Sequence, residues 1–294
     1  MATIIEDLKL QFRTGDAITK LIFWNIALFA IPYILFGILR LSGIEIPWMH
    51  YVSLSSDASD LLWKPWSLIT YAFFHVGIMH ILFNLIMLHF SGRLFVTFFI
   101  RKQLLSLYFV SAIFAGLLYI ISYAIFPSLA NLKTELVGAS GAVMAILFAV
   151  AAYAPMMEIR LIVIGNVKLW HIALVLLIID LVQLSVSNTG GHLAHLGGAF
   201  FGYLYITRLR KGTDITSWFS KIVDWITNLF VSKPKTPFRT VHKNVSPKPK
   251  AASSRIVTKS RTQQQIDEIL DKISKSGYDS LTTEEKEFLF RAGK

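Results

Sequence analysis

The amino-acid sequence predicts an all-α, polytopic membrane protein that crosses the bilayer six times. Hydrophobic residues make up 54% of the 294 residues, and charged residues only 16%, against about a quarter in a typical soluble domain. The mean hydropathy of +0.56 points the same way. A spanning helix needs about twenty predominantly apolar residues. Six such runs occur, at about residues 21–39, 78–98, 104–126, 137–154, 169–184 and 192–209.

The basic residues predict the orientation in the membrane. Six spans place both termini on the same side of the bilayer. Lys and Arg gather before the first run, after the second, between the fourth and fifth, and after the sixth. Since short cytoplasmic loops carry an excess of these residues, both termini are predicted to be cytoplasmic, and runs two, four and six begin at the outer face. The first twenty residues lack the pattern of a removable signal peptide, and a bacterial plasma membrane is the expected location.

The composition argues against several classes of function. With no cysteine, the chain has no disulfide, thiolate metal site or cysteine nucleophile. A net charge of +11 is also seen in nucleic-acid-binding proteins, but the basic tail lacks the aromatic side chains on which bases stack. The excess of basic residues on the cytoplasmic side is the preferred interpretation. The lipid bilayer is the expected partner, and no nucleic acid, metal or cofactor is expected.

The segments around the six-helix membrane domain (21–211) divide into four parts. Residues 1–20 are predicted to be a cytosolic N-terminal segment. Residues 212–231 have helical amphipathic spacing, which predicts an interfacial helix on the inner leaflet; packing on a partner or domain is the alternative. Residues 232–262, rich in Lys, Pro and Ser, are predicted to be a disordered basic linker. Residues 263–294 are expected to form a small helical cytosolic appendage, to which no function is assigned.

Two candidate catalytic groups stand near the start of inward-running helices. The stretch Gly138–Gly141 opens the fourth run and places Ser140 at the positive end of the helix dipole, where an alkoxide is stabilised. His195 opens the sixth run at a similar depth, and a neutral imidazole can take the proton of the serine and return it to a leaving amine. The alternatives are a close-packing serine among small residues and a buried histidine bonded to a backbone carbonyl.

Glycines predict that these two runs approach closely. Gly198 and Gly202 leave one face of the sixth run without side chains, so that the fourth run can approach through Gly141. Gly138 is assigned to the same set of helix-packing glycines. Close packing would bring the serine and histidine within hydrogen-bond reach.

A third pair of polar groups opens the second run. His80 and Asn84 are four residues apart, which places both on one helical face. Both can donate hydrogen bonds, and together with the backbone N–H of Ser140 they are candidates for binding an oxyanion. The alternative is that they only hydrogen-bond the first loop to the second run.

A carboxylate to complete a triad is not found at an obvious spacing. Asp180 in the fifth run is a second-choice orienter for a histidine, and its preferred interpretation is a helix-packing or water-contacting residue. His192, the first residue of the sixth run, is placed ahead of the helix proper and is expected at the interface. A serine–histidine dyad is therefore the simplest hypothesis.

At these residues the sequence resembles the rhomboid family of intramembrane serine proteases, in its bacterial six-helix form with a C-terminal cytosolic extension. The motifs are G-x-S-G at Gly138–Gly141, A-H-x-x-G-x-x-x-G at Ala194–Gly202 and H-x-x-x-N at His80–Asn84. The resemblance spans about residues 21–209. It implies that the long first loop, about residues 42–77 and without a strand pattern, helps to hold the fold in the membrane.

The resemblance also implies roles for individual residues. Ser140 would be the nucleophile and His195 the general base, with His80, Asn84 and the Ser140 backbone binding the oxyanion. Many bacterial members have a tyrosine four residues after the nucleophile, and here that position is Met144. A methionine can still pack against the histidine ring.

The expected function is cleavage of single-pass membrane proteins near the outer face by acyl transfer to the serine. A non-catalytic rhomboid-like chaperone or quality-control scaffold is the alternative, and the intact pair of Ser140 and His195 favours the enzyme. A transporter would call for inverted repeats and paired charges near the midplane, and the sequence shows neither.

Overall fold

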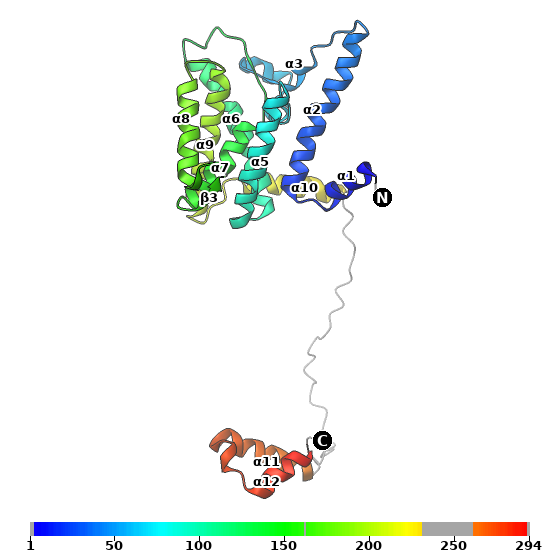
Figure 1. Cartoon of the computed structure of the whole chain (residues 1–294), viewed down its shortest axis with the longest axis vertical. Coiled ribbons are helices and arrows are strands. Elements are labelled where there is room, and N and C mark those ends of the chain that lie inside the picture. Colours follow the sequence, from blue (N-terminus) through cyan, green and yellow to red (C-terminus); the bar gives the residue numbers. More distant parts are fainter. Residues whose placement is uncertain (1–2, 162, 231–260, 293–294) are drawn as a thin grey trace, which may run out of the picture. The chain divides into compact units, whose positions relative to one another are not determined.

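The computed structural model describes residues 3–161, 163–230 and 261–292 (Figure 1). The chain divides into two units, Met1–Lys233 and Pro234–Lys294. Each unit is described by itself.

The larger unit is a bundle of helices with two small antiparallel pairs of strands. Its helices of five or more residues are α1 (Ile4–Thr14), α2 (Ala17–Leu41), α3 (Trp48–Val52), η1 (Ala58–Leu62), α5 (Ile78–Phe98), α6 (Arg101–Ile125), α7 (Ser140–Tyr153), α8 (Leu169–Gln183), α9 (Thr189–Leu209) and α10 (Ser217–Phe230). The six predicted runs correspond to α2, α5, α6, α7, α8 and α9, with ends within a few residues of the expected ones. Figure 1 shows α1 and α10 across one end of the bundle and α3 at the other end.

Length and composition identify this bundle as a polytopic membrane domain. Three of the described helices, α2, α5 and α6, are long and apolar enough to cross a bilayer, and α7 and α8 are shorter apolar helices. The 21-residue α9 carries five glycines and two histidines, which make it less apolar. Large apolar side chains such as Ile31 and Ile34 of α2 are more than 60% exposed. Such exposure suits contact with lipid, because hydrocarbon does not penalise an apolar surface.

The short helix α7 is the centre of the bundle. Ten of its fourteen residues are buried, and it contacts α5, α6, α8 and α9. Small residues such as Gly141, Ala142 and Ala145 allow these neighbours to come close. Because protein surrounds α7, its position is defined by packing on several sides.

The first loop is more ordered than its sequence suggests. Besides α3 and η1 it contains α4 (Ser67–Thr70), η2 (Tyr71–Phe73) and the strand β1 (Leu54–Ser55). β1 pairs antiparallel with β2 (Glu135–Leu136), the strand just before α7, with Leu54 opposite Leu136. The expectation of a loop without strands is therefore wrong. A second pair of strands was also not predicted: the hairpin of β3 (Glu158–Leu161) and β4 (Gly165–Lys168), which connects α7 to α8.

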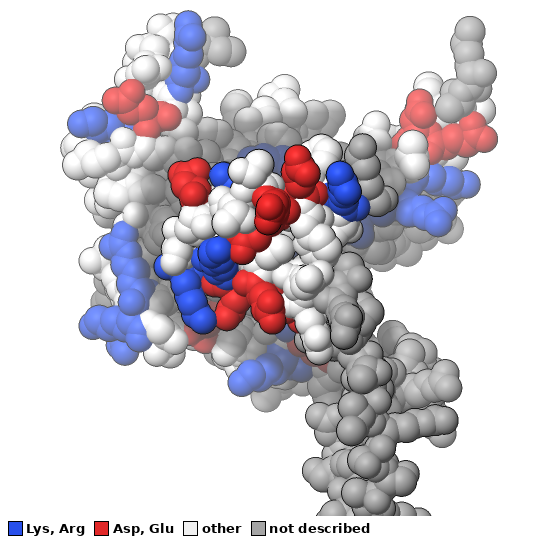
Figure 2. Space-filling view, turned by 90° about the horizontal axis from the view of Figure 1, so that it is seen from below, with Lys and Arg blue, Asp and Glu red and all other residues white. Residues whose placement is uncertain are grey.

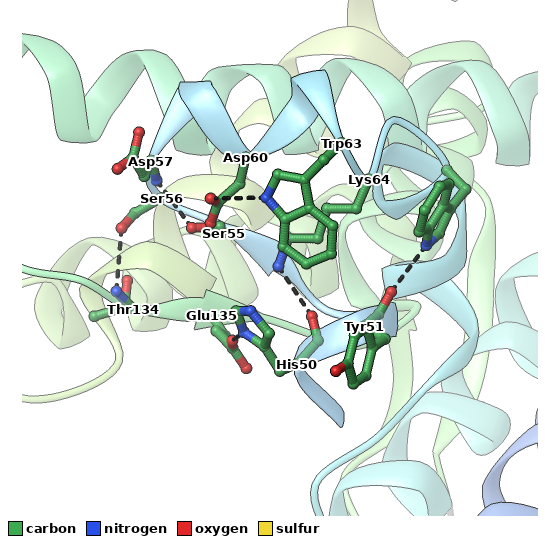
Figure 3. Close-up of polar contacts among 11 residues, drawn as sticks. His50, Tyr51, Ser55, Ser56, Asp57, Asp60, Trp63, Lys64, Thr134 and Glu135 are labelled. Carbon is green, nitrogen blue, oxygen red and sulfur yellow. Dashed lines mark hydrogen bonds and ion pairs between the residues drawn. The ribbon is translucent and has the colours of Figure 1, made fainter. Parts of the chain in front are cut away.

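Polar contacts tie this loop together around the β1–β2 pair (Figure 3). Lys64 is fully buried, and its Nζ donates to the carbonyl of His50 at 2.9 Å. His50 Nδ1 in turn lies in hydrogen-bond contact with the Glu135 carboxylate of β2. Ser56 donates through its hydroxyl to the carbonyl of Leu132. These contacts attach the loop to the segment that leads into α7.

The amphipathic segment after the bundle forms the helix α10, and its position on the inner leaflet stays a prediction. Phe219 stacks on Phe109 of α6 with ring centroids 5.2 Å apart, and Asp224 forms an ion pair with Lys102 at 2.5 Å. Trp225 and Leu229 stay more than 60% exposed. One face of α10 therefore contacts the bundle, while another remains apolar and uncovered in the described residues.

The smaller unit contains α11 (Arg261–Ser276), η3 (Tyr278–Ser280) and α12 (Thr283–Ala292). Thr282 and Glu285 form a reciprocal cap at the start of α12, and Lys272 of α11 reaches the same carboxylate at 2.9 Å. In Figure 2, acidic and basic residues lie next to one another on the face that is seen from below. Residues 232–260 of the predicted linker lie outside the described residues.

Candidate active site

A sharp turn delivers Ser140 to the first position of α7. Gly138 has a φ of +126°, a conformation that L residues with a side chain rarely adopt. Its N–H donates to the carbonyl of Tyr71 at 2.8 Å, and a Cβ there would come within 2.8 Å of His80 Nε2. The assignment of Gly138 to helix packing is therefore wrong, because this glycine serves the turn before α7 and the close approach of His80.

The other three glycines lie where helices meet. A Cβ on Gly198 would be 1.9 Å from the carbonyl oxygen of Gly141, and one on Gly202 would be 2.1 Å from that of Ala145. A Cβ on Gly141 would be 3.0 Å from the Cβ of Ala115 in α6. The backbones of α7 and α9 are thus in direct contact at two positions one turn apart, which places their N-terminal ends next to each other.

At those ends the serine and the histidine meet. His195 Nε2 lies 2.6 Å from Ser140 Oγ, within hydrogen-bond distance. Both line a cavity of about 530 Å³ between α5, α7, α8 and α9. Apolar side chains form much of its wall, among them Phe83, Met144 and Leu176. The pair therefore lies in the wall of a largely apolar cavity.

The other ring nitrogen of His195 meets a carboxylate. Asp180 of α8 lies with its Oδ1 2.8 Å from His195 Nδ1 and 2.7 Å from His192 Nδ1. The Asp180 side chain is only 6% exposed. The preferred interpretation of Asp180 as a packing or water-contacting residue is therefore wrong. The placement of His192 ahead of the helix is also wrong, because α9 begins at Thr189.

Sequence spacing could not reveal this contact, since α8 and α9 are separate helices whose relative rotation depends on packing. Two signals were nevertheless present. His192 and His195 are three residues apart, hence on one helical face, and Asp180 is a carboxylate in an otherwise apolar run. The three residues each offer one ligand atom, all within 4.8 Å of one another, so this group has the composition and spacing to hold a metal ion.

The groups expected to bind an oxyanion border the same cavity. His80 and Asn84 both line it. Asn84 Nδ2 donates to the carbonyl of His80 at 2.9 Å, a bond within α5 itself. His80 Nδ1 and Asn84 Oδ1 have no hydrogen-bond partner within the described part of the chain. The hydrogen bond of Asn84 thus stays within its own helix and does not go to the first loop.

A further buried histidine lies behind this pair. The rings of His75 and His80 are 5.0 Å apart, and neither ring nitrogen of His75 has a partner among the described residues. Burial, with a smaller contribution from His80, lowers the pKa of His75 to about 3. His75 is therefore neutral at physiological pH.

Comparisons with known proteins agree with this architecture. A model of the family described as "Rhomboid domain" matches residues 62–212, just over half of the chain. Residues 257–292 match a family of unknown function, DUF6576. A protein of Arabidopsis thaliana named "RHOMBOID-like protein 12, mitochondrial" is 31% identical over 157 residues, which cover 50% of this chain and 47% of that relative. The chain thus spans about half the length of this relative.

Proposed function

This chain belongs to the rhomboid family, and on that premise we propose that it is an intramembrane serine protease that hydrolyses peptide bonds of membrane proteins. The observation that carries the proposal is the 2.6 Å distance between Ser140 Oγ and His195 Nε2. A serine within hydrogen-bond reach of a base is the arrangement that nucleophilic catalysis requires.

The proposed reaction has two halves. Ser140 Oγ attacks the peptide carbonyl carbon while His195 Nε2 takes the hydroxyl proton. The tetrahedral intermediate collapses, the C–N bond breaks, and the imidazolium returns the proton to the leaving amine. Water then adds to the acyl ester with His195 again as base, which releases the new carboxylate and restores the serine hydroxyl.

Negative charge develops on the carbonyl oxygen in both halves. The Ser140 N–H is the proposed main donor, because it lies in the first turn of α7, where backbone N–H groups have no intrahelical partner. His80 and Asn84 are the proposed side-chain donors from the facing wall of the cavity. Removing one such donor lowers the rate by about 100- to 1,000-fold, and that loss is expected for Asn84→Ala.

The proposed substrate is a single-pass membrane protein that reaches the site from the bilayer. Its scissile segment must unwind, because a helix holds its carbonyls in internal hydrogen bonds. Small or helix-breaking residues at the cut site should therefore help. Equal cleavage of a helix-breaking substrate and its all-leucine counterpart would contradict this preference. The proposed orientation, with both termini cytoplasmic in a bacterial plasma membrane, rests on the basic residues flanking the spans.

The test is covalent labelling of the detergent-solubilised full chain with a fluorescent fluorophosphonate. Wild-type protein should label, and Ser140→Ala should not. Ser122→Ala is a matched control, because Ser122 is buried in α6 and bonds its hydroxyl to the carbonyl of Leu118. Absence of labelling that depends on Ser140 would favour the non-catalytic scaffold.

A further inference from the structure

Asp180 occupies an unusual position on α8. Of the fifteen residues of this helix, three are buried, namely Leu169, Ala173 and Asp180. Its apolar neighbours Ile179 and Leu181 are about half exposed. The Asp180 carboxylate thus faces the interior of the protein, while the apolar side chains next to it in sequence face outward. Burial of a charge is costly unless hydrogen bonds compensate it, and here two imidazole rings do so.

The contact decides which nitrogen of His195 carries the proton. An ionised carboxylate can only accept hydrogen bonds, so the 2.8 Å contact with Asp180 Oδ1 requires the proton on Nδ1. In the neutral ring, Nε2 then presents its lone pair to Ser140 Oγ at 2.6 Å. This is the tautomer that a general base needs. The carboxylate would also stabilise the imidazolium formed when the serine proton is taken.

His192 holds the carboxylate in place. It lies one turn before His195 on the same face of α9, and its Nδ1 is 2.7 Å from the same oxygen, Asp180 Oδ1. Two donors converging on one oxygen restrict the rotation of the side chain more than one donor does. His192 is not in hydrogen-bond contact with Ser140 in the structure, so its effect on the base passes through Asp180.

We propose that Asp180 is a positioning residue for the catalytic base, so that α8, α9 and α7 together form an Asp180–His195–Ser140 triad in place of a dyad. The proposal rests on the proposed protease function. In this triad, α8 supplies neither the nucleophile nor the base, but its Asp180 sets the tautomer and orientation of His195. His192 is assigned as the second anchor of the Asp180 carboxylate.

The experiment uses Asp180→Asn in the full chain, with the fluorophosphonate probe as reactant. An amide has nearly the same shape but can present its NH₂ to Nδ1, which would stabilise the wrong tautomer. The maximal labelling rate should fall by about 100- to 10,000-fold, the range that general base catalysis contributes. The probe concentration for half-maximal rate should stay unchanged, because Asp180 does not bind the probe.

Chemical rescue distinguishes positioning from a structural role. Asp180→Ala leaves space for a small anion, so added formate should raise its labelling rate by accepting a hydrogen bond from the Nδ1–H of His195. Formate should have no effect on Asp180→Asn, where the amide fills the space. His192→Ala should lower the labelling rate, but less than Asp180→Asn does, because one of the two donors to Asp180 Oδ1 is lost while the contact between Asp180 and His195 remains.

The outcomes separate this inference from the function on which it rests. Wild-type protein that shows no labelling dependent on Ser140 overturns both. Active wild type together with a folded Asp180→Asn variant of equal labelling rate overturns the triad alone. An Asp180→Ala variant with a lowered unfolding temperature and no response to formate also overturns it, because its loss would then be structural.

Discussion

Substitution of Gly198 by alanine would place a methyl group where α9 touches α7, three residues after His195. The added Cβ would be 1.9 Å from the carbonyl oxygen of Gly141. A carbon and a carbonyl oxygen normally approach no closer than about 3.3 Å. Since the obstacle is backbone and not a flexible side chain, the helices must separate by about 1.4 Å to relieve the contact.

This separation acts directly on the proposed catalytic pair, His195 and Ser140. The distance of 2.6 Å between His195 Nε2 and Ser140 Oγ would lengthen to about 4 Å if the helices move apart along that line, beyond the reach of a hydrogen bond. A misplacement of about 1 Å can cost roughly 100-fold in rate, so activity should fall at least that far. Overpacking should also lower the free energy of unfolding by about 1–3 kcal/mol.

The assay is the fluorophosphonate labelling rate, together with unfolding of the protein in mixed micelles. Gly37→Ala is the matched control. It adds the same methyl group in α2, where a Cβ would meet nothing within 4 Å. Alanine is favoured over glycine in a helix by about 1 kcal/mol, so this control should be at least as stable as wild type. A Gly198→Ala variant with wild-type labelling and unfolding would refute the close-contact reasoning.

Two further predictions concern the first loop and the histidine–carboxylate group. The Ser59 hydroxyl and N–H, by donating to Asp57, lower the pKa of that carboxyl from 3.8. The stability that Asp57 contributes should be fully present above pH 3.8 and should disappear as the pH falls through the lowered pKa. The unfolding temperatures of Asp57→Ala and wild type should therefore differ at pH 7 and converge in acid. A difference that stays constant with pH would contradict the assignment. Added Zn²⁺ should slow fluorophosphonate labelling, because Asp180, His192 and His195 offer ligand atoms within 4.8 Å of one another and zinc accepts imidazole and carboxylate ligands. Removal of the zinc with EDTA should restore the labelling rate. Equally strong inhibition of the His192→Ala variant would argue against this site.

Much of the fold could be predicted from residue order alone. Each spanning helix must satisfy its own backbone hydrogen bonds and cover the hydrocarbon thickness. The ends of a long apolar run such as 78–98 therefore predict the ends of the helix, and α5 begins and ends at those residues. The close approach of α7 and α9 was also predictable, because Gly198 and Gly202 expose backbone at a spacing of one turn.

Other features depend on contacts between segments that are distant in sequence. The two-residue strands β1 and β2 are too short to show any alternation, and they exist because Leu54 and Leu136 are brought together by the folded bundle. The role of Gly138 also needed the structure, since its φ of +126° and its contact with His80 arise from the turn before α7.

The sequence by itself determined that this chain is a polytopic all-α membrane protein, with six predicted membrane helices, and it singled out Ser140 and His195 as candidates. These follow from hydrophobic length and from local motifs, which are properties of contiguous residues. Only the tertiary structure decided that Asp180 faces His195 and His192. The direction in which a helix turns its one carboxylate depends on its rotation against its neighbours, and that rotation is set by packing across the whole bundle.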